Sequence, residues 1–285
     1  MMPRKFARAI ARSLPGLKAE NSGAGVHNGP SVAIIIPTFN SAAYISGAVT
    51  SALSSRGVSV SVLVVDDASS DMTTEVVRNL SEQDHRIRLV TNQTNRGSYV
   101  CKNIGIEQSE SDYLAFLDSD DVQHPDRLWY QISQLERNDL TKATYCRLRR
   151  WDTSFRYPMR GLRMGFVTSI FHRTLIDEIG FFDSVRFGAD AEFHDRLLAK
   201  FGPKATQVLP NELYFARFRE GSVTSSGDGQ IFFRTGRGSI RFRASETRRR
   251  YRENFRNWHL NSSNLYMGFP LESRPFQVSG RKQEG

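Results

Sequence analysis

Three carboxylates follow directly after an apolar run, in the segment Asp118-Ser119-Asp120-Asp121. The preceding residues, Tyr113 to Leu117, have the length and composition of a buried strand. Like charges this close oppose one another's ionisation, so a positive group should share their surroundings. Oxygen ligands at a strand end suit Mg²⁺ or Mn²⁺, which take few carboxylates together with phosphates. The alternative is a solvated acidic turn in which Asp121 or His124 caps the helix that Pro125 opens.

The residues around this segment alternate between strand and helix patterns. Apolar runs that predict buried strands lie at 32–36, 60–65, 87–90 and 113–117. Apolar residues at helical spacing separate these runs, and Asn40 or Ser41 is placed to cap the first helix. The alternation predicts an α/β fold with a mostly parallel sheet and right-handed crossovers.

Each predicted strand ends in polar residues, and ligands of such sheets bind where strands end. The exits are Pro37-Thr38-Phe39-Asn40, Asp66-Asp67, residues 92–97, and Asp118 to Asp121. One edge of the sheet therefore gathers at least five carboxylates. Helix caps alone would not require so many, because one acid caps one helix.

Composition limits the possible classes of protein. The 285 residues, 39% of them hydrophobic, fit a globular enzyme rather than a disordered chain. No apolar stretch approaches the ~18 residues of a membrane-spanning helix. The net charge of +9 implies an acidic partner, such as nucleic acid, anionic lipid or an anionic substrate. Cys101 and Cys146 form no CxxC pair, so we expect no disulfide framework or structural zinc, and a cytoplasmic location.

The pattern predicts three regions: a basic N-terminal extension and linker (1–30), an α/β domain (31–225) and a basic, aromatic C-terminal extension (226–285). The first could form an amphipathic helix on the inner face of an anionic membrane, or a solvated tail. The C-terminal extension, which predicts a helix followed by irregular structure, is suited to docking on a membrane, a partner or the body of the enzyme.

Over roughly residues 31 to 225 the chain resembles a family 2 glycosyltransferase with the GT-A nucleotide-sugar-binding fold, a mostly parallel mixed sheet flanked by helices. The resemblance rests on the order and spacing of several short motifs. They are Ile36-Pro37-Thr38-Phe39-Asn40, Val65 to Asp71, Asn95-Arg96-Gly97 with Lys102-Asn103, Phe116 to Asp121, Gly180-Phe181-Phe182-Asp183, Gly188-Ala189-Asp190 and Gly221-Ser222-Val223-Thr224. These motifs identify no particular donor sugar.

The resemblance implies where a nucleoside-diphosphate sugar binds. Residues 37–40, with Thr38 and Phe39 at their centre, would line the base pocket, and Asp67 would accept a hydrogen bond from a uracil-type ring nitrogen. Asp118 and Asp120, on either side of Ser119, would hold the ribose and a Mn²⁺ or Mg²⁺ ion, with Asp121 as a competing metal ligand. A divalent ion bridging the diphosphate neutralises charge as the glycosyl bond breaks.

The resemblance also places further polar residues near the donor, namely Arg96, Lys102, Asn103, Arg217, Arg219 and Ser222. For Arg96 the alternative is ordinary polarity at a helix start. The family often has His where Arg219 stands. A guanidinium cannot act as a base but grips phosphate oxygens bidentately, so Arg217 and Arg219 are interpreted as contacts to the donor diphosphate or to an acceptor anion. The alternative is a strand with one basic face.

Asp190 aligns with the acid that, in inverting members of the family, removes the proton of the acceptor hydroxyl. The chain departs from the family pattern of an acidic pair, because Ala189 replaces the first acid. Asp190 could instead cap the helix that runs through Leu198, and Glu192 is the reserve candidate for the base.

The leading hypothesis is metal-assisted transfer of a sugar, with inversion, from a UDP-type donor to a glycan or lipid-linked acceptor of a cell-surface polysaccharide. Six arginines among aromatic residues in 147–163 suggest an acidic acceptor. A nucleotidyltransferase would carry a Gly-rich loop after the first strand, where Pro37 to Asn40 stand. The sequence contains no recognisable nucleic-acid motif, and clustered carboxylates repel phosphates. A catalytically inactive glycan-binding protein remains an alternative because of Ala189.

Overall fold

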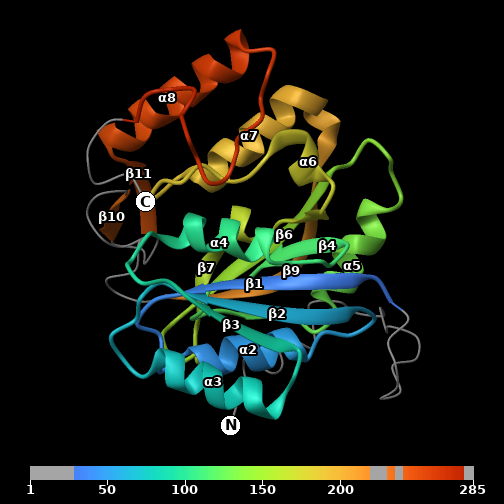
Figure 1. Ribbon diagram of the computed structural model, residues 1–285, viewed down its shortest axis with the longest axis vertical. Coiled ribbons are helices and arrows are strands. Elements are labelled where there is room, and N and C mark those ends of the chain that lie inside the picture. The colour runs from blue at the N-terminus through green and yellow to red at the C-terminus, as the bar shows by residue number, and fades with distance from the viewer. Residues whose placement is uncertain (1–28, 219–229, 235–239, 279–285) are drawn as a thin grey trace.

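The computed structural model of the chain describes residues 29–218, 230–234 and 240–278. Its main sheet contains nine strands in the order β3-β2-β1-β4-β8-β6-β9-β5, with β7 paired to β6, and helices cover both faces (Figure 1). The strands of this sheet are β1 (Ser31–Thr38), β2 (Ser59–Asp66), β3 (Ile87–Thr91), β4 (Tyr113–Phe116), β5 (Val122–Gln123), β6 (Ala143–Trp151), β7 (Pro158–Met164), β8 (Ile170–His172) and β9 (Thr206–Arg217). The helices are α2 (Ile45–Leu53), α3 (Thr73–Gln83), α4 (Ser98–Glu107), α5 (Arg127–Leu135), α6 (Leu175–Ile179), α7 (Ala189–Phe201) and α8 (Glu246–Asn261). A separate antiparallel hairpin joins β10 (Gln230–Arg234) to β11 (Ile240–Ala244).

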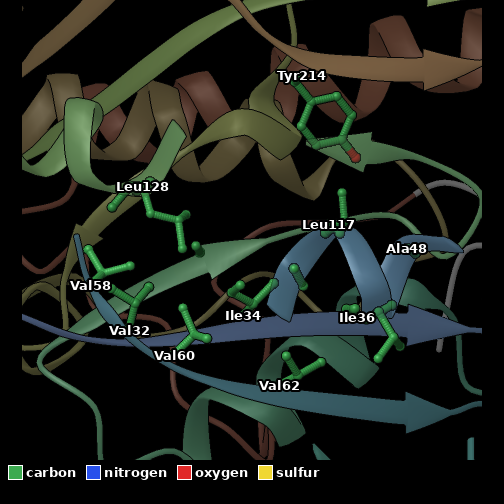
Figure 2. Close-up of a cluster of buried hydrophobic side chains, with 14 of the residues drawn as sticks. Val32, Ile34, Ile36, Ala48, Val58, Val60, Val62, Leu117, Leu128 and Tyr214 are labelled. Atoms are coloured by element: carbon green, nitrogen blue, oxygen red, sulfur yellow. The ribbon is translucent and has the colours of Figure 1, made fainter. Parts of the chain in front are cut away.

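The first four strands form the parallel half of the sheet, which confirms the predicted β/α units. β1 pairs in parallel with β2 and β4, and β2 pairs in parallel with β3. Alternate side chains of a strand point to opposite faces. Val32, Ile34 and Ile36 therefore pack in the cluster under α2 (Figure 2), whereas Ala33 and Ile35 pack under α4. Continuous apolar runs are what a strand covered on both faces requires.

The second half of the sheet is mixed. β8 is antiparallel to β4 and to β6, whereas β9 runs parallel to β6. The two-residue strand β5 pairs antiparallel with the end of β9, through Val122 with Phe215 and Gln123 with Tyr214. This pairing brings the last residues of β9 beside the acidic segment that precedes β5.

The predicted cap of α2 is wrong. The helix begins at Ile45 with Tyr44 at the N-cap position. Asn40 and Ser41 instead bind the segment before α3: the Asn40 side-chain oxygen accepts from the N–H of Ser70 at 2.9 Å, and the N–H of Ser41 donates to Thr73 Oγ1 at 2.8 Å. The polar residues after β1 thus tie together two loops at the strand ends.

The C-terminal helix α8 packs along α7, on the face of the sheet that carries α4 (Figure 1). Its residues Tyr251 and Phe255 are buried in the same apolar cluster as Phe193 of α7. The Tyr251 hydroxyl donates to Asp183 at 3.0 Å. The C-terminal extension was expected to dock on a membrane, a partner or the body of the enzyme. The aromatic face of α8 packs on the body of the protein.

Among the described helices, none combines the length and the apolar character that crossing a bilayer requires. The predicted N-terminal extension falls almost wholly outside the described residues, as does the predicted boundary near residue 225. The division into three regions stays a prediction.

Candidate functional site

The carboxyl ends of β1, β2 and β4 meet at one edge of the sheet. Thr38 pairs with Asp66 at the last register position of β1 and β2, and the N–H of Asp67 donates to the Thr38 carbonyl at 2.8 Å. On the other side of β1, the hydroxyls of Ser41 and Ser119 lie 2.8 Å apart. The predicted convergence of the polar strand exits is confirmed.

Two arginine side chains lie beside the acidic segment, as the crowding of its carboxylates led us to expect. Asp121 is buried, and burial raises its pKa well above the ordinary value, with further increases from the charges of Asp120 and Asp118. Burial lowers the pKa of the Arg150 guanidinium on β6, and the three carboxylates oppose that shift. Arg217, at the end of β9, lies close enough for Asp120 and Asp121 to act on its pKa in the same way.

Arg217 binds the acidic segment from several sides. Its N–H donates to Asp121 Oδ1 at 2.7 Å and its Nε to the Asp120 carbonyl at 3.0 Å. The guanidinium carbon lies 4.2 Å from the ring centre of Phe155 and 4.8 Å from that of Tyr44, and the group also donates to the carbonyl of Thr153. These contacts give Arg217 a positioning role, and its expected contact with a donor diphosphate or an acceptor anion stays a prediction. The other two residues expected in this region, Arg219 and Ser222, lie outside the described residues.

The acidic segment does not form a complete metal cage. In the described parts of the chain, no three His, Cys, Asp or Glu side chains are arranged to hold a metal ion, so the expected triple ligand set is not preformed. Asp118 and Asp120 are partly exposed, close enough to repel Asp121, and offer the oxygen donors that Mg²⁺ and Mn²⁺ prefer. These residues fit a divalent ion whose remaining ligands come from a bound diphosphate. Of the two alternative caps, Asp121 instead accepts from the N–H of Arg217, whereas His124 Nδ1 accepts from the N–H of Asp126 at 3.0 Å, just before α5.

Asp67 fastens the segment between β3 and α4. Its Oδ1 accepts from Asn92 Nδ2 at 2.9 Å and from the Arg96 N–H at 2.8 Å, and its Oδ2 accepts from the Gly97 N–H at 2.7 Å. Gly97 has φ of +95°, which favours glycine. Three of the roughly four lone-pair positions of the carboxylate are therefore taken. The Cys101 thiol also forms a hydrogen bond with this carboxylate, and the bond from Asp67 to a nucleobase stays a prediction.

The end of β1 presents an unused polar atom. The Thr38 hydroxyl is buried and has no hydrogen-bond partner within the described residues. The next side chain, Phe39, is 45% exposed. A buried hydroxyl left unpaired costs about 1–3 kcal/mol.

Two expected donor contacts prove to be structural. Lys102 is buried with its Nζ 5.1–5.9 Å from the ring centres of Tyr99, Phe116 and Phe182. The fully buried Asn103 donates to the Phe182 carbonyl at 2.8 Å and accepts from its N–H at 3.0 Å. Both side chains hold the turn at 180–183 against α4, and their burial separates them from solvent. The Arg96 side chain, by contrast, is exposed.

Asp190 lies in the first turn of α7 and is partly exposed. Its Oδ1 accepts from the N–H of Ala191 at 2.9 Å, and the N-cap position belongs to Gly188. Burial raises the pKa of Tyr99 well above its usual value, and the neighbouring Asp190 carboxylate raises it further. Asp190 also raises the pKa of the buried Tyr145. The carboxylate is therefore surrounded by side chains of α4, β6 and α7 rather than capping its helix.

Glu192 is excluded as the reserve base. It is fully buried, accepts from Arg196 Nε at 2.9 Å and lies 3.0 Å from His259 Nε2. Arg196 in turn donates to the carbonyls of Ile179 and Phe181. A general base must come within hydrogen-bond reach of an acceptor hydroxyl, which this buried carboxylate cannot do.

The structure adds Arg248 of α8 to the surroundings of Asp190. Burial lowers the pKa of this guanidinium, and the charges of Tyr99 and Asp190 oppose the shift. Sequence reasoning treated the arginines of this region as one basic segment. The helical spacing of Arg248, Tyr251 and Phe255 was the signal that distinguishes Arg248 from the other arginines of this segment, because it places all three residues on the buried face of the helix.

Two of the six arginines in 147–163 have acidic neighbours within the protein itself. Arg149 pairs with Glu212 of β9, and Arg150 faces the acidic segment. Arg156 is exposed in the turn between β6 and β7. The acidic-acceptor hypothesis for this stretch therefore loses part of its support and stays a prediction.

The chain is similar in sequence to a known protein family and to several of its members. A family model described as Glycosyl transferase family 2 matches residues 33–200. Succinoglycan biosynthesis protein ExoO of Rhizobium meliloti (strain 1021) is 31% identical over 222 residues, covering 68% of this chain and 63% of that protein. UDP-Glc:alpha-D-GlcNAc-diphosphoundecaprenol beta-1,3-glucosyltransferase WfgD of Escherichia coli is 36% identical over 110 residues, covering 39% of this chain and 43% of that protein.

Among solved structures, S. aureus TarS 1-349 in complex with UDP-GlcNAc matches with a TM-score of 0.57 at 21% identity, over 69% of this chain and 61% of that one. At this identity the likeness establishes the fold, and the expected GT-A architecture is confirmed. The chain spans between 43% and 63% of the length of the two curated relatives.

Proposed function

Because the chain belongs to glycosyl transferase family 2, we propose that it is an enzyme that transfers a sugar from a nucleoside-diphosphate donor to a glycan or lipid-linked acceptor. The observation that carries the proposal is the shared edge of β1, β2 and β4. There Thr38, whose buried hydroxyl has no partner among the described residues, ends β1, and the Ser41 and Ser119 hydroxyls join the loop after β1 to the segment that bears the partly exposed Asp118 and Asp120. Such an edge is where ligands of open α/β sheets bind.

The proposed donor is a UDP-sugar. The name of WfgD specifies UDP-Glc, and TarS has been solved with UDP-GlcNAc. Thr38 and Phe39 would contact the base, and Asp118 and Asp120 would hold the ribose and a divalent ion. That ion supplies neutralisation of the diphosphate charge when it is bound.

Asp190 is the proposed general base. It would take the proton of the acceptor hydroxyl while that oxygen attacks the anomeric carbon, and the diphosphate would leave from the opposite face. This single displacement inverts the anomeric configuration. Its partly exposed position in the first turn of α7 suits contact with an acceptor.

The proposed setting is the synthesis of a cell-surface polysaccharide at the cytoplasmic face of the membrane. ExoO is named for succinoglycan biosynthesis, and the name of WfgD includes a diphosphoundecaprenol acceptor. The exposed face of α8 carries Arg249, Arg250 and Arg252 and would suit a peripheral contact with anionic lipid.

Thermal unfolding of the full chain in the presence of UDP, GDP, CDP or dTDP, each with and without Mn²⁺, tests the donor site. UDP with Mn²⁺ should raise the Tm most, because a ligand that binds the folded state stabilises it. Asp120→Ala should remove this shift, whereas Asp190→Asn should keep it. A chain that responds to no nucleotide would contradict the proposal.

A further inference from the structure

The C-terminal helix α8 packs on α7. Its first turn is capped by Ser245, whose hydroxyl accepts from the N–H of Arg248 at 3.2 Å. Further along, Arg256 donates to Asp195 at 2.9 Å and His259 lies 3.0 Å from Glu192. Side chains on the inner face of α8 are therefore held in defined positions beside the first turn of α7.

Arg248 is held in this way without an acidic partner of its own. Its guanidinium carbon lies 4.6 Å from the ring centre of Phe187, and its buried Nε has no hydrogen-bond partner in the part of the chain that the structure describes. Other arginines of α8 have direct partners: Arg250 pairs with Glu246 and Arg256 with Asp195. No ion pair of Arg248 occurs among the described residues, although the charge of Asp190 acts on it.

The two acids in the first turn of α7 differ in the partners that they have. Glu192 forms a buried ion pair with Arg196 and lies 3.0 Å from His259 Nε2. Asp190 forms a hydrogen bond with the Tyr99 side chain and has no ion pair among the residues that the structure describes. A partly buried guanidinium loses hydration, and an incoming anion that forms charge-assisted hydrogen bonds restores it.

We propose that Arg248 binds an anionic group of the acceptor, a phosphate or a carboxylate, beside the hydroxyl that Asp190 deprotonates. This inference rests on the proposed function and narrows its acceptor to a negatively charged one. The phosphate of a lipid-linked saccharide and the carboxylate of an acidic sugar share this chemistry, since both accept two parallel bonds from a guanidinium.

Binding to the full chain can be measured by calorimetry or ligand-observed NMR with three probes: N-acetylglucosamine 1-phosphate, methyl β-D-glucuronide and the neutral methyl β-D-glucoside. The unmodified chain should bind an anionic probe at least about tenfold more tightly than the neutral one, the range of a hydrogen bond to a charged group. Arg248→Gln should abolish this preference, and Arg248→Lys should keep part of it. The preferred anionic probe identifies the phosphate or the carboxylate as the source.

Arg249→Gln is the matched control, because it removes the same charge from an exposed position of the same helix. It should keep the preference, and all three variants should bind UDP within about twofold of the unmodified chain and unfold at a similar temperature. Equal binding of anionic and neutral probes by the unmodified chain, or an equal loss in Arg249→Gln, would overturn the inference. A fall in UDP affinity in Arg248→Gln would assign the residue to the donor instead. Failure of UDP to bind any form would refute the proposed function separately.

Discussion

Replacing Asp121 by asparagine should stabilise the folded protein at neutral pH. Asp121 is only 5% exposed, and its ionised form is opposed by burial and by the charges of Asp120 and Asp118. An asparagine oxygen can still accept the 2.7 Å bond from the N–H of Arg217. The substitution removes the desolvation and repulsion, at the cost of weaker attraction to Arg150 and Arg217. We expect a net gain of about 1–3 kcal/mol in the free energy of unfolding.

The direction of the pKa shift of Asp121 determines how its contribution to stability changes with pH. The folded-state pKa of Asp121 is raised above its ordinary value of 3.8, so the folded state binds more protons than the unfolded state as pH rises from that value. The contribution of Asp121 to stability therefore falls as pH rises from about 4 through the folded-state pKa. In Asp121→Asn this decline should be absent, and the two proteins should become similar in stability below about pH 4.

Urea unfolding at a series of pH values measures both effects. Asp139→Asn is the control, because it removes an exposed aspartate charge and should change stability by less than about 0.5 kcal/mol. Destabilisation by Asp121→Asn at neutral pH, or an unchanged pH profile, would refute the reasoning that Asp121 is a net cost to folding.

Three further substitutions test other parts of the structure. Glu192→Gln should lower the free energy of unfolding, measured in urea, by about 3–5 kcal/mol, because it leaves the buried Arg196 without its carboxylate. The control is Glu246→Gln, which breaks the exposed ion pair with Arg250 and should lower that free energy by less than about 1 kcal/mol. Gly105→Ala should cost about 1–3 kcal/mol and lower the Tm, since its Cβ would lie 2.5 Å from Ile35 Cγ2; an unchanged Tm would mean that α4 can shift. Asp190→Asn should reduce transfer measured as UDP release about 10²–10⁴-fold while UDP binding persists, and near-normal turnover would exclude it as the base.

The parallel half of the fold could be predicted because its determinants are local. The runs at 32–36 and 60–65 are apolar throughout, as strands covered on both faces must be, and their polar exits follow at once. The antiparallel strands were harder to predict. β5 has two residues and β8 three, and each is defined by a partner far along the chain rather than by its own pattern.

Individual site residues were predicted by type more securely than by role. Asn103 and Glu192 are polar residues near expected motifs, yet each contacts a group far along the chain. Asn103 forms hydrogen bonds with the backbone of Phe182, and Glu192 lies next to His259 of α8. A sequence motif identifies which side chain is polar but not which backbone atom will reach it. The packing of α8 on α7 brings His259 to Glu192, and the packing of the turn at 180–183 on α4 brings Phe182 to Asn103. Nothing in the local pattern of either residue reveals these partners.

The acidic edge shows how folding and ligand binding make separate demands on the same carboxylates. Its crowding led us to expect one cation, whereas the fold already supplies the charges of Arg150 and Arg217 from β6 and β9. Arg217 binds Asp121 and the Asp120 carbonyl, which are the groups turned into the protein. Asp118 and the Asp120 side chain stay partly exposed. The fold thus binds the inward groups of the segment through Arg217 and leaves the Asp118 and Asp120 side chains accessible to a ligand.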